Sequence, residues 1–332
     1  MLKNSKILIT GGTGSFGNAF VKMTLEKFKP SRLVIFSRDE MKQWEMAKKF
    51  KDDGPVRYFI GDVRDKDRLY RALDGIDYVI HAAALKIVPT AEYNPFEYVK
   101  TNILGTMNLI DACIDQKVKR VVALSTDKAC SPVNLYGATK LAADKMISAG
   151  NVYSGEQNTK FANVRYGNVM GSRGSVIPYF LEQQEKKSIP ITDVRMTRFM
   201  ITLEEAVELV WKAFSDMEGG ETYIKKISSM KVTDIAKAIA PGKEYQIIGI
   251  RPGEKLHEEM ISKDDSNYTY EYNDYYKILP ALNDWANSKD RIKDGIKVKD
   301  GFSYTSNNNE NWMEVNTLRT WIEKNRSKIG SI

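Results

Sequence analysis

Tyr136 and Lys140 are four positions apart, a spacing that brings both side chains to one face of a helix. A phenol is a poor base at its ordinary pKa of about 10, but a neighbouring ammonium group stabilises the phenolate. Such a pair can take a proton from a hydroxyl group while a hydride leaves the same carbon. The spacing therefore predicts oxidation of an alcohol, and the alternative interpretation is an ordinary pair on a helix surface.

A glycine-rich segment near the start of the chain, Thr10-Gly11-Gly12-Thr13-Gly14-Ser15-Phe16-Gly17, follows an apolar run and precedes a helix expected over 18–28. Glycines permit a tight turn, and backbone amides at a helix N-terminus bind a pyrophosphate. Glycine-rich turns also occur in ordinary loops. The position between a strand and a helix favours a dinucleotide-binding turn that includes Gly11, Thr13, Gly14, Ser15, Phe16 and Gly17.

The elements that must position these residues begin with six short apolar runs, at 7–9, 33–36, 56–60, 78–82, 121–124 and 161–164. Helical patterns separate most of them, so the sequence predicts an α/β fold with a Rossmann-type, doubly wound parallel sheet. Ligands bind such sheets at the carboxyl ends of the strands. The fifth run ends in Ser125-Thr126-Asp127-Lys128, shortly before the helix of Tyr136.

The ends of the second and third runs bear on the choice of dinucleotide. Ser37 and Arg38 follow the second run and suit the 2′-phosphate of NADP, where an NAD site usually carries an acidic residue. The alternative is that Arg38 is only solvated and that Asp39 contacts the ribose. Asp62, after the third run, is expected near the adenine amino group, and capping of the next helix is a competing or additional role.

The composition narrows the class of protein. Hydrophobic residues make up 42% and charged residues 28% of the 332 residues, as in folded globular proteins. The net charge of +7 comes from lysines and arginines spread along the chain, which favours a polyphosphate small molecule over nucleic acid as the partner. The start does not match a signal peptide and no apolar stretch reaches membrane-spanning length, so we expect a cytoplasmic protein without a membrane segment.

Cysteine and histidine usage predicts neither disulfides nor a metal centre. The two cysteines, Cys113 and Cys130, fall in segments expected to be core helix or strand-end turn, so buried free thiols are favoured. His81 and His257 are too isolated to form a metal site.

The second half of the chain has a looser pattern, which predicts a smaller α/β unit over the sheet. Helices are expected at about 178–187, 203–217 and 231–240, with a short apolar run at 246–250. We expect an NADP-binding domain over 1–170 and a mainly substrate-binding domain over 171–332, with some segments returning to the first. Residues 268–276 are expected as a packed edge or loop, and the polar stretch 303–311 as a loop before a last helix.

Several motifs together resemble the extended short-chain dehydrogenases/reductases. They are the glycine turn, Gly61-Asp62-Val63-Arg64-Asp65, His81-Ala82-Ala83-Ala84-Leu85-Lys86, Thr101-Asn102 and Tyr136-x-x-x-Lys140. Within that group the chain is more similar to the inverting UDP-N-acetylglucosamine 4,6-dehydratases of bacterial pseudaminic acid biosynthesis, a route to flagellin glycosylation. This likeness rests on Ser125–Cys130, Arg165–Val169, Gly171–Val176, Met196–Phe199, Arg251–Glu258 and the late Tyr304–Asn308. The retaining dehydratases carry Asp-Glu where this chain has Asp127-Lys128.

The resemblance implies a three-stage reaction with NADP as the cofactor. Tyr136 would take the C4 hydroxyl proton as hydride leaves, water would then leave across C5 and C6, and hydride would return to C6 with inversion at C5. Lys128 would be the C5 base and Asp127 the proton donor to the C6 oxygen, with Thr126 and Lys140 in support. Neutral Lys128 costs roughly 4.6 kcal/mol at pH 7 from its ordinary pKa, so the site must lower that pKa, and Lys86 and Lys140 would help if they face one pocket.

The resemblance also implies the remaining contacts. Further cofactor contacts are Lys42, Val63, Ala82, Ala84, Thr101 and Val169, and substrate contacts are Lys86, Asn168, Arg173, Thr192, Met196, Thr197, Arg251 and Glu254. Asn168, Arg173 and Thr197 are expected in loops that face the cleft. A guanidinium such as Arg251 can bind a diphosphate, and a surface salt bridge with Glu254 is the alternative.

The same resemblance implies a protein that takes a UDP-sugar and forms a homo-oligomer, a hexamer in proteins of this length. The helices expected near 95–116 and 136–150 resemble those that form a shared four-helix dimer face in short-chain dehydrogenases. Two alternatives stay open at this point. One is an epimerase or reductase acting on a UDP-sugar, which would not need Asp127-Lys128. The other is a non-catalytic NADP-sensing regulator, which the intact Tyr136–Lys140 pair disfavours.

Overall fold

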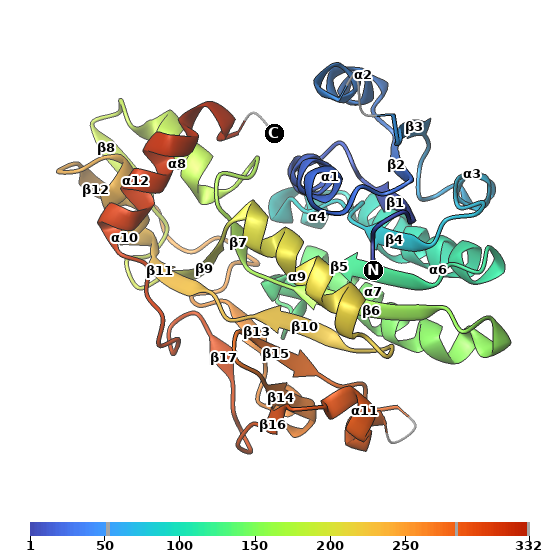
Figure 1. Cartoon of the computed structure of the whole chain (residues 1–332). Helices are drawn as coiled ribbons and strands as arrows, with labels where there is room; N and C mark the ends of the chain where they lie inside the picture. The colour runs from blue at the N-terminus through green and yellow to red at the C-terminus, as the bar shows by residue number, and fades with distance from the viewer. Residues whose placement is uncertain (51–53, 283–284, 331–332) are drawn as a thin grey trace.

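The six apolar runs form six parallel strands in the computed structural model, which describes residues 1–50, 54–282 and 285–330. The strands are β1 (Lys6–Thr10), β2 (Arg32–Ser37), β3 (Val56–Ile60), β4 (Tyr78–His81), β5 (Arg120–Leu124) and β6 (Lys160–Arg165). They pair in the order β3-β2-β1-β4-β5-β6 (Figure 1). This is the doubly wound Rossmann order, and it confirms the predicted fold class.

The layers of the fold follow from the alternation of side chains along each strand. In β1, Ile7 and Ile9 belong to the apolar cluster that includes α1 (Ser15–Phe28) and α9 (Leu203–Asp216). Leu8 points to the other face and joins the cluster of α3 (Lys66–Ala72), α6 (Gly105–Asp115) and α7 (Leu135–Tyr153). Because both faces are covered by helices, the central residues of β1, β2, β4 and β5 are apolar and buried. Helix α2 (Glu40–Lys49) connects β2 to β3.

The helical connection between β4 and β5 is interrupted. The expected helix over 95–116 consists of α5 (Pro95–Tyr98), the π-helix η1 (Val99–Leu104) and α6, preceded by α4 (Val88–Tyr93). Within η1, the buried amide of Asn102 accepts from Leu85 N at 2.9 Å and donates to Leu85 O at 2.9 Å. π-Helical turns are frequent at functional sites, and here the turn anchors the loop that follows β4.

The second half of the chain first widens the main sheet. Strand β10 (Thr222–Lys225) pairs in parallel with β6, and β15 (Tyr275–Ile278), β14 (Thr269–Glu271) and β16 (Ile296–Lys297) continue the sheet in antiparallel pairing. This part, which includes α11 (Lys289–Ile292), lies at the lower edge of Figure 1. The prediction that 268–276 forms a packed edge is confirmed.

The rest of the second half forms a smaller lobe, at the left of Figure 1. It contains α8 (Val176–Gln183), α10 (Val232–Ile239) and α12 (Val315–Asn325) around their own apolar cluster. Its strands are β7 (Asn168–Val169), β8 (Ser188–Ile191), β9 (Thr197–Ile201), β11 (Ser228–Lys231) and β12 (Glu244–Ile247). The predicted helices near 178, 203 and 231 correspond to α8, α9 and α10, and the run 246–250 begins within β12.

The polar stretch 303–311 is not simply a loop. It contains β17 (Tyr304–Thr305), which pairs antiparallel with β13 (Glu259–Ile261), and its Ser306 is fully buried. Short 3-10 helices complete the described chain: η2 (Asp127–Ala129), η3 (Gly155–Gln157), η4 (Asp264–Tyr268), η5 (Trp285–Asn287) and η6 (Arg326–Lys328). Cys113 and Cys130 are buried free thiols, as predicted. Among the described helices, none has the length and apolarity needed to span a membrane.

Candidate active site

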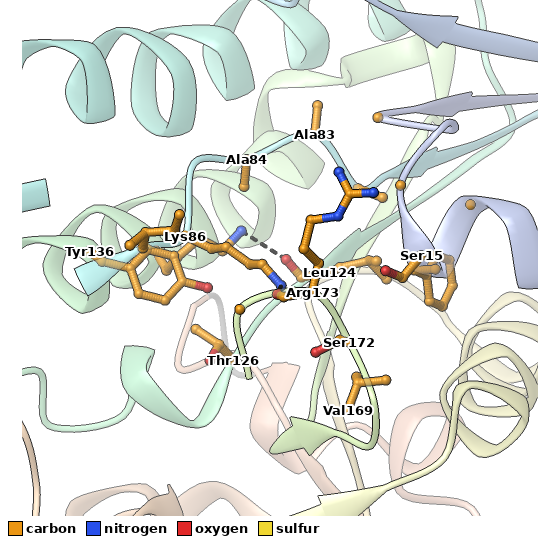
Figure 2. Close-up of a pocket in the computed structure, with 18 of the residues that line it drawn as sticks. Ser15, Ala83, Ala84, Lys86, Leu124, Thr126, Tyr136, Val169, Ser172 and Arg173 are labelled. Carbon is orange, nitrogen blue, oxygen red and sulfur yellow. Dashed lines mark hydrogen bonds between the residues drawn. The ribbon is translucent and has the colours of Figure 1, made fainter. Parts of the chain in front are cut away.

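A cleft of about 770 Å³ lies at the carboxyl ends of the parallel strands, where the loops after β1 to β6 meet the smaller lobe. Its volume is within the range of small-molecule sites. Figure 2 shows Tyr136, Thr126 and Lys86 toward one end of the cleft, Ser15 toward the other, and Arg173 between them. Residues from both halves of the chain therefore line one continuous space.

The glycine turn after β1 has the geometry of a phosphate cradle. Gly11 adopts a φ of +64°, and a Cβ there would lie 2.8 Å from the backbone of Ala83. A Cβ at Gly17 would collide with the backbone of Gly12, so the first turn of α1 packs directly on the loop. Since the N-terminus of α1 opens toward the cleft, the turn fits the pyrophosphate of a dinucleotide.

Past the end of β2, the cleft carries more positive than free negative charge. Asp39 caps α2 by accepting from Lys42 N at 3.0 Å, and its carboxylate pairs with Lys42 Nζ at 2.8 Å. These contacts with Lys42 lower the pKa of Asp39. Arg38 is half exposed, and its Nη1 lies 3.5 Å from Asp62 Oδ2. Asp39 is therefore engaged by its own helix, while Arg38 borders the cleft.

Asp62 lines the cleft but does not cap the helix that follows. Asp65 is the cap of α3, since its side chain accepts from Arg68 N at 2.9 Å. Asp62 pairs instead with Arg64 Nη2 at 2.7 Å. Burial acts to raise the pKa of Asp62, but the hydrogen bonds from Arg64 outweigh it and lower that pKa. The capping role considered for Asp62 is thus wrong.

Tyr136 lies in the first turn of α7, which begins at a firm cap. Asn134 Oδ1 accepts from Gly137 N at 2.8 Å, and Asn134 Nδ2 donates to Gly253 O at 2.7 Å. Burial raises the pKa of Tyr136 to about 12, while Lys128 and a hydrogen bond with Thr126 act to lower it. The cap therefore ties the start of the Tyr136 helix to the 251–258 segment of the smaller lobe.

Lys140 is buried on the same helix and also contacts the end of β5. Its Nζ donates to Leu124 O at 2.8 Å, and burial lowers its pKa. Lys128 is a further cation that acts to lower the pKa of Tyr136. Lys140 thus anchors the helix to the end of β5.

Asp127 and Lys128 form the short η2 turn directly after β5. Lys128 Nζ lies 3.0 Å from Asp127 Oδ1 and 3.3 Å from Oε1 of the buried Glu258. Burial acts to lower the pKa of Lys128, but these two carboxylates outweigh it and raise that pKa above its ordinary value. The expectation that the site lowers the pKa of Lys128 is wrong, although Lys86, Lys128 and Lys140 do line one cleft.

Asp127 differs from an ordinary surface carboxylate in its burial and in its raised pKa. Its side chain is 1% exposed, and burial together with the charge of Glu258 raises its pKa, while Lys128 and Thr126 act to lower it. A buried carboxyl group with a raised pKa can serve as a proton donor. The pair therefore combines an ammonium group with a carboxyl group that accepts a proton more readily than an ordinary surface carboxylate.

The smaller lobe contributes cations to the same cleft. Lys86 Nζ donates to Arg173 O at 3.1 Å, the dashed line in Figure 2. Burial and the charges of Arg173 and Lys128 lower the pKa of Lys86. Arg251 Nε lies 3.2 Å from Glu254 Oε1, so the salt bridge considered above is present, and both residues also line the cleft. The arrangement fits a polyphosphate ligand.

Most residues expected in the site do line the cleft. All five expected catalytic residues and all expected cofactor contacts are among its lining, together with Lys86, Asn168, Arg173, Arg251 and Glu254. Lining residues that the sequence analysis did not single out are Phe36, Gly61, Ala83, Ile87, Val88, Pro89, Leu124, Ser125, Tyr166, Gly167, Ser172, Gly174, Ser175 and Leu203. Many of these residues adjoin expected site residues in the chain. Their position directly after a predicted strand was therefore the sequence signal that could have identified them as cleft residues.

Three expected substrate contacts lie elsewhere. Thr197 is not in a cleft-facing loop but in β9, 3% exposed, with its Oγ1 2.8 Å from His257 Nδ1 and 2.6 Å from Ser306 Oγ. Met196 is buried in the apolar cluster of the smaller lobe, and Thr192 follows β8. None of the three is among the cleft lining. Across the described residues, no group of His, Cys, Asp and Glu side chains converges on a possible metal position.

The Rossmann strand order, the glycine turn and the Tyr136–Lys140 pair at the end of β5 define an extended short-chain dehydrogenase/reductase. The sequence pattern of the family described as "Polysaccharide biosynthesis protein" matches residues 7–280. The chain belongs to this family.

Comparisons with individual proteins give near full-length matches. A UDP-N-acetylglucosamine 4,6-dehydratase (inverting) from Campylobacter jejuni is 57% identical over 327 residues, which cover 96% of this chain and 97% of the relative. A UDP-glucose 4-epimerase from Rickettsia massiliae is 39% identical over 332 residues, 96% of each protein. The X-ray structure of Pen from Bacillus thuringiensis superposes with a TM-score of 0.89 at 39% identity, covering 98% of this chain and 99% of Pen.

Proposed function

We propose that the protein is an NADP-dependent, C5-inverting UDP-N-acetylglucosamine 4,6-dehydratase, a hydro-lyase. Its product is UDP-2-acetamido-2,6-dideoxy-β-L-arabino-hex-4-ulose, and the reaction is the first step of pseudaminic acid biosynthesis. The observation that carries this proposal is the Asp127–Lys128 pair, which lies in the same cleft as Tyr136 and the glycine turn. The 57% identical inverting dehydratase supports it.

The proposal includes NADP rather than NAD. Arg38 and Lys42 border the cleft beyond β2, and Asp39, the acidic residue at that position, is occupied by its own helix. A 2′-phosphate would find two cations there and no free carboxylate of Asp39. When bound, the nicotinamide supplies the acceptor and later the donor of the hydride.

The oxidation step uses the phenol of Tyr136. The phenolate of Tyr136 takes the C4 hydroxyl proton as hydride leaves C4, which makes a 4-keto sugar and renders the C5 proton acidic. Burial raises the pKa of Tyr136 to about 12 even though Lys128 and a hydrogen bond with Thr126 act to lower it, so the phenolate depends on these neighbours for part of its stabilisation. Lys140 keeps the helix of Tyr136 in register with β5 through Leu124 O.

The elimination step uses the Asp127–Lys128 pair. Transfer of one proton from Lys128 Nζ to Asp127 Oδ1, across 3.0 Å, yields an amine and a carboxylic acid. The amine takes the C5 proton and the acid protonates the C6 oxygen, which leaves as water while the C5–C6 double bond forms. Hydride then returns to C6, and a proton derived from solvent adds to the other face of C5, which inverts that centre.

Lys86, Arg173 and Arg251 hold the UDP group in this proposal, with Asn168 and Glu254 at the same end of the cleft. Residues 1–170 act as the cofactor domain and 171–332 mainly as the substrate domain. Roles for Thr192, Met196 and Thr197 in this proposal are indirect, through packing of the smaller lobe.

One incubation tests the proposal. The protein is supplied with NADP and UDP-N-acetylglucosamine in D2O, and the product is followed by mass spectrometry and by NMR at C5 and C6. We expect loss of one water, a C6 methyl group, deuterium at C5 and the inverted C5 configuration. A product with the mass of the substrate would instead support a UDP-sugar epimerase, the activity in the name of the 39% identical Rickettsia relative.

A further inference from the structure

Glu258 lies outside the cleft lining, yet it contacts the residue at the centre of the proposed elimination. It is 2% exposed, and its Oε1 lies 3.3 Å from Lys128 Nζ. Lys128 Nζ lies 3.0 Å from Asp127 Oδ1 on its other side. One ammonium is therefore shared between two buried carboxylates, one of which faces the cleft and one of which does not.

The backbone and side chain of Glu258 are held by groups from three parts of the chain. Glu258 N donates to Ser306 Oγ at 2.9 Å, and Ser306 N donates to Glu258 O at 2.8 Å. Arg198 Nε, from β9, lies 3.6 Å from Glu258 Oε1, and that guanidinium also donates to Leu256 O at 3.2 Å. Ser306, which directly follows β17, thus fixes the backbone of Glu258, while Lys128 and Arg198 contact its carboxylate.

The charged groups around Glu258 favour its ionised form. Burial acts to raise the pKa of Glu258, but Lys128, Arg198 and Lys255 outweigh it and lower that pKa. The neighbouring His257 is turned to Thr197, 2.8 Å away. Glu258 is therefore a fixed negative charge behind the catalytic pair.

Within the described residues, Asp127 Oδ2 and Glu258 Oε2 are buried without a hydrogen-bond partner. Two buried carboxylates beside one ammonium bind a proton more tightly than either would alone, because like charges oppose the loss of that proton. Asp127 is the member that faces the cleft. A proton retained by this cluster is therefore available to a substrate through Asp127.

We propose that Glu258 is a positioning residue for the dehydration step, whose negative charge retains the transferable proton within the Asp127–Lys128 pair. The inference rests on the proposed function. The proton count is unchanged by Glu258: Lys128 passes one proton to Asp127, the amine gains the C5 proton, and Asp127 gives its proton to the departing C6 oxygen. Glu258 itself gains and loses none, and it acts only through its charge.

Glu258→Gln tests this role because it removes the charge and keeps the shape. Without that charge, both Asp127 and Lys128 release their protons at lower pH, so the pH profile of dehydration moves to lower pH as a whole. We expect a displacement of about one pH unit and about a tenfold loss of turnover on the alkaline side. Transient cofactor reduction, which reports C4 oxidation, should persist.

Glu259→Gln is the matched control, since Glu259 is the adjacent carboxylate and bonds to Ser131 Oγ instead of Lys128. Its pH profile should match that of the wild type. Glu258→Asp keeps the charge one methylene further away, so its profile should lie between those of the wild type and Glu258→Gln. This variant decides the matter if Glu258→Gln does not fold.

An unchanged pH profile in Glu258→Asp and Glu258→Gln would overturn the inference, as would equal loss of C4 oxidation and dehydration. A wild-type protein that does not dehydrate UDP-N-acetylglucosamine would overturn the proposed function instead. The two failures are therefore distinguishable.

Discussion

At the scale of single residues, Lys128 has two electrostatic roles, since it pairs with Asp127 and lowers the pKa of Tyr136. We expect Lys128→Met to retain some C4 oxidation, with the pH profile of that step displaced to higher pH because the phenol loses a neighbouring cation. Exchange at C5 and product formation should fall by about 10²–10⁴. Transient NADPH absorbance and deuterium incorporation at C5 measure the two steps separately.

Tyr136→Phe should differ from Lys128→Met, because without the phenol no hydride moves and both steps vanish together. Lys145→Met, an exposed lysine on the same helix as Tyr136, is the control. Near wild-type turnover in Lys128→Met would show that the Lys128 ammonium takes no part in the reaction.

Arg38 carries the prediction on cofactor choice. Its side chain is 52% exposed at the cleft, so it can reorient from Asp62 toward a 2′-phosphate. We expect Arg38→Ala to weaken NADP binding by about 1.5–3 kcal/mol, the range for a hydrogen bond to a charged group, and to leave NAD binding nearly unchanged. Fluorescence titration with both dinucleotides measures this, with Arg32→Ala, an exposed arginine at the far end of β2, as control. An unaltered NADP/NAD ratio would contradict the assignment.

The sequence could locate residues that follow parallel strands, because all such strand ends meet at one edge of the sheet. This is why Arg38, Asp127 and Tyr136 are in the cleft as expected. Glu258 was missed as a functional residue because its position depends on the pairing of β13 with β17, about 45 residues apart in the chain. Thr197 was wrongly expected in a loop that faces the cleft, because a resemblance in sequence does not show whether a side chain is buried.

At the scale of elements, the six apolar runs and the helices of the second half were predictable because their signals are local. The π-helix η1 was not, since its form depends on the bonds of Asn102 to Leu85. The stretch 303–311 has the composition of a loop, and only its distant partner strand makes part of it regular. Composition alone therefore cannot predict a strand whose hydrogen-bonding partner is far away in the sequence.

An ion cluster supports the added edge of the main sheet, and its stability is predicted to depend on pH. Asp216, at the end of α9, lies 2.7 Å from the buried Lys277 Nζ and 2.9 Å from Lys293 Nζ. Burial acts to raise the pKa of Asp216, but hydrogen bonds from Lys277 and Lys293 outweigh it and lower that pKa to about 2. The ionised carboxylate therefore stabilises the fold above pH 4, and this contribution is lost as the pH falls toward 2.

We expect Asp216→Asn to lower the free energy of unfolding by about 2–4 kcal/mol at pH 7, because Lys277 is left buried beside a neutral group. The difference from the wild type should narrow between pH 4 and pH 2. Denaturant unfolding at several pH values measures it. Asp234→Asn removes an exposed pair with Lys237 and should change stability by less than about 1 kcal/mol. A constant difference across that pH range would contradict the assignment.

At the scale of the whole molecule, the cleft lies between the sheet and a lobe that the chain enters and leaves several times. Segments 203–225, 269–282 and 285–297 return to the main sheet, while 170–200, 228–247 and 315–325 form the lobe. A division into two contiguous domains near residue 170 therefore describes the observed arrangement only approximately, because parts of the second half belong to the main sheet. The cleft is completed by residues from both halves, such as Lys128 and Arg173.

The same scale carries the prediction of a homo-oligomer. Leu104 and Met107, three residues apart across the junction of η1 and α6, are 45% and 47% exposed, so they form an apolar surface on the helices expected to make a dimer face. We expect the protein to be an oligomer, a hexamer by family resemblance, in light scattering at micromolar concentration. Met107→Glu should lower the measured mass, because burying a carboxylate in an apolar interface costs free energy.

Ile296→Glu is the control for this change, since Ile296 is 73% exposed on β16, the outermost strand at one edge of the main sheet and away from η1 and α6. The control should keep the wild-type mass. Both variants alter exposed side chains, so circular dichroism should show the wild-type fold in each. A monomeric wild-type protein, or equal effects of the two substitutions on the mass, would show that the Leu104–Met107 surface is not an interface between copies of the chain.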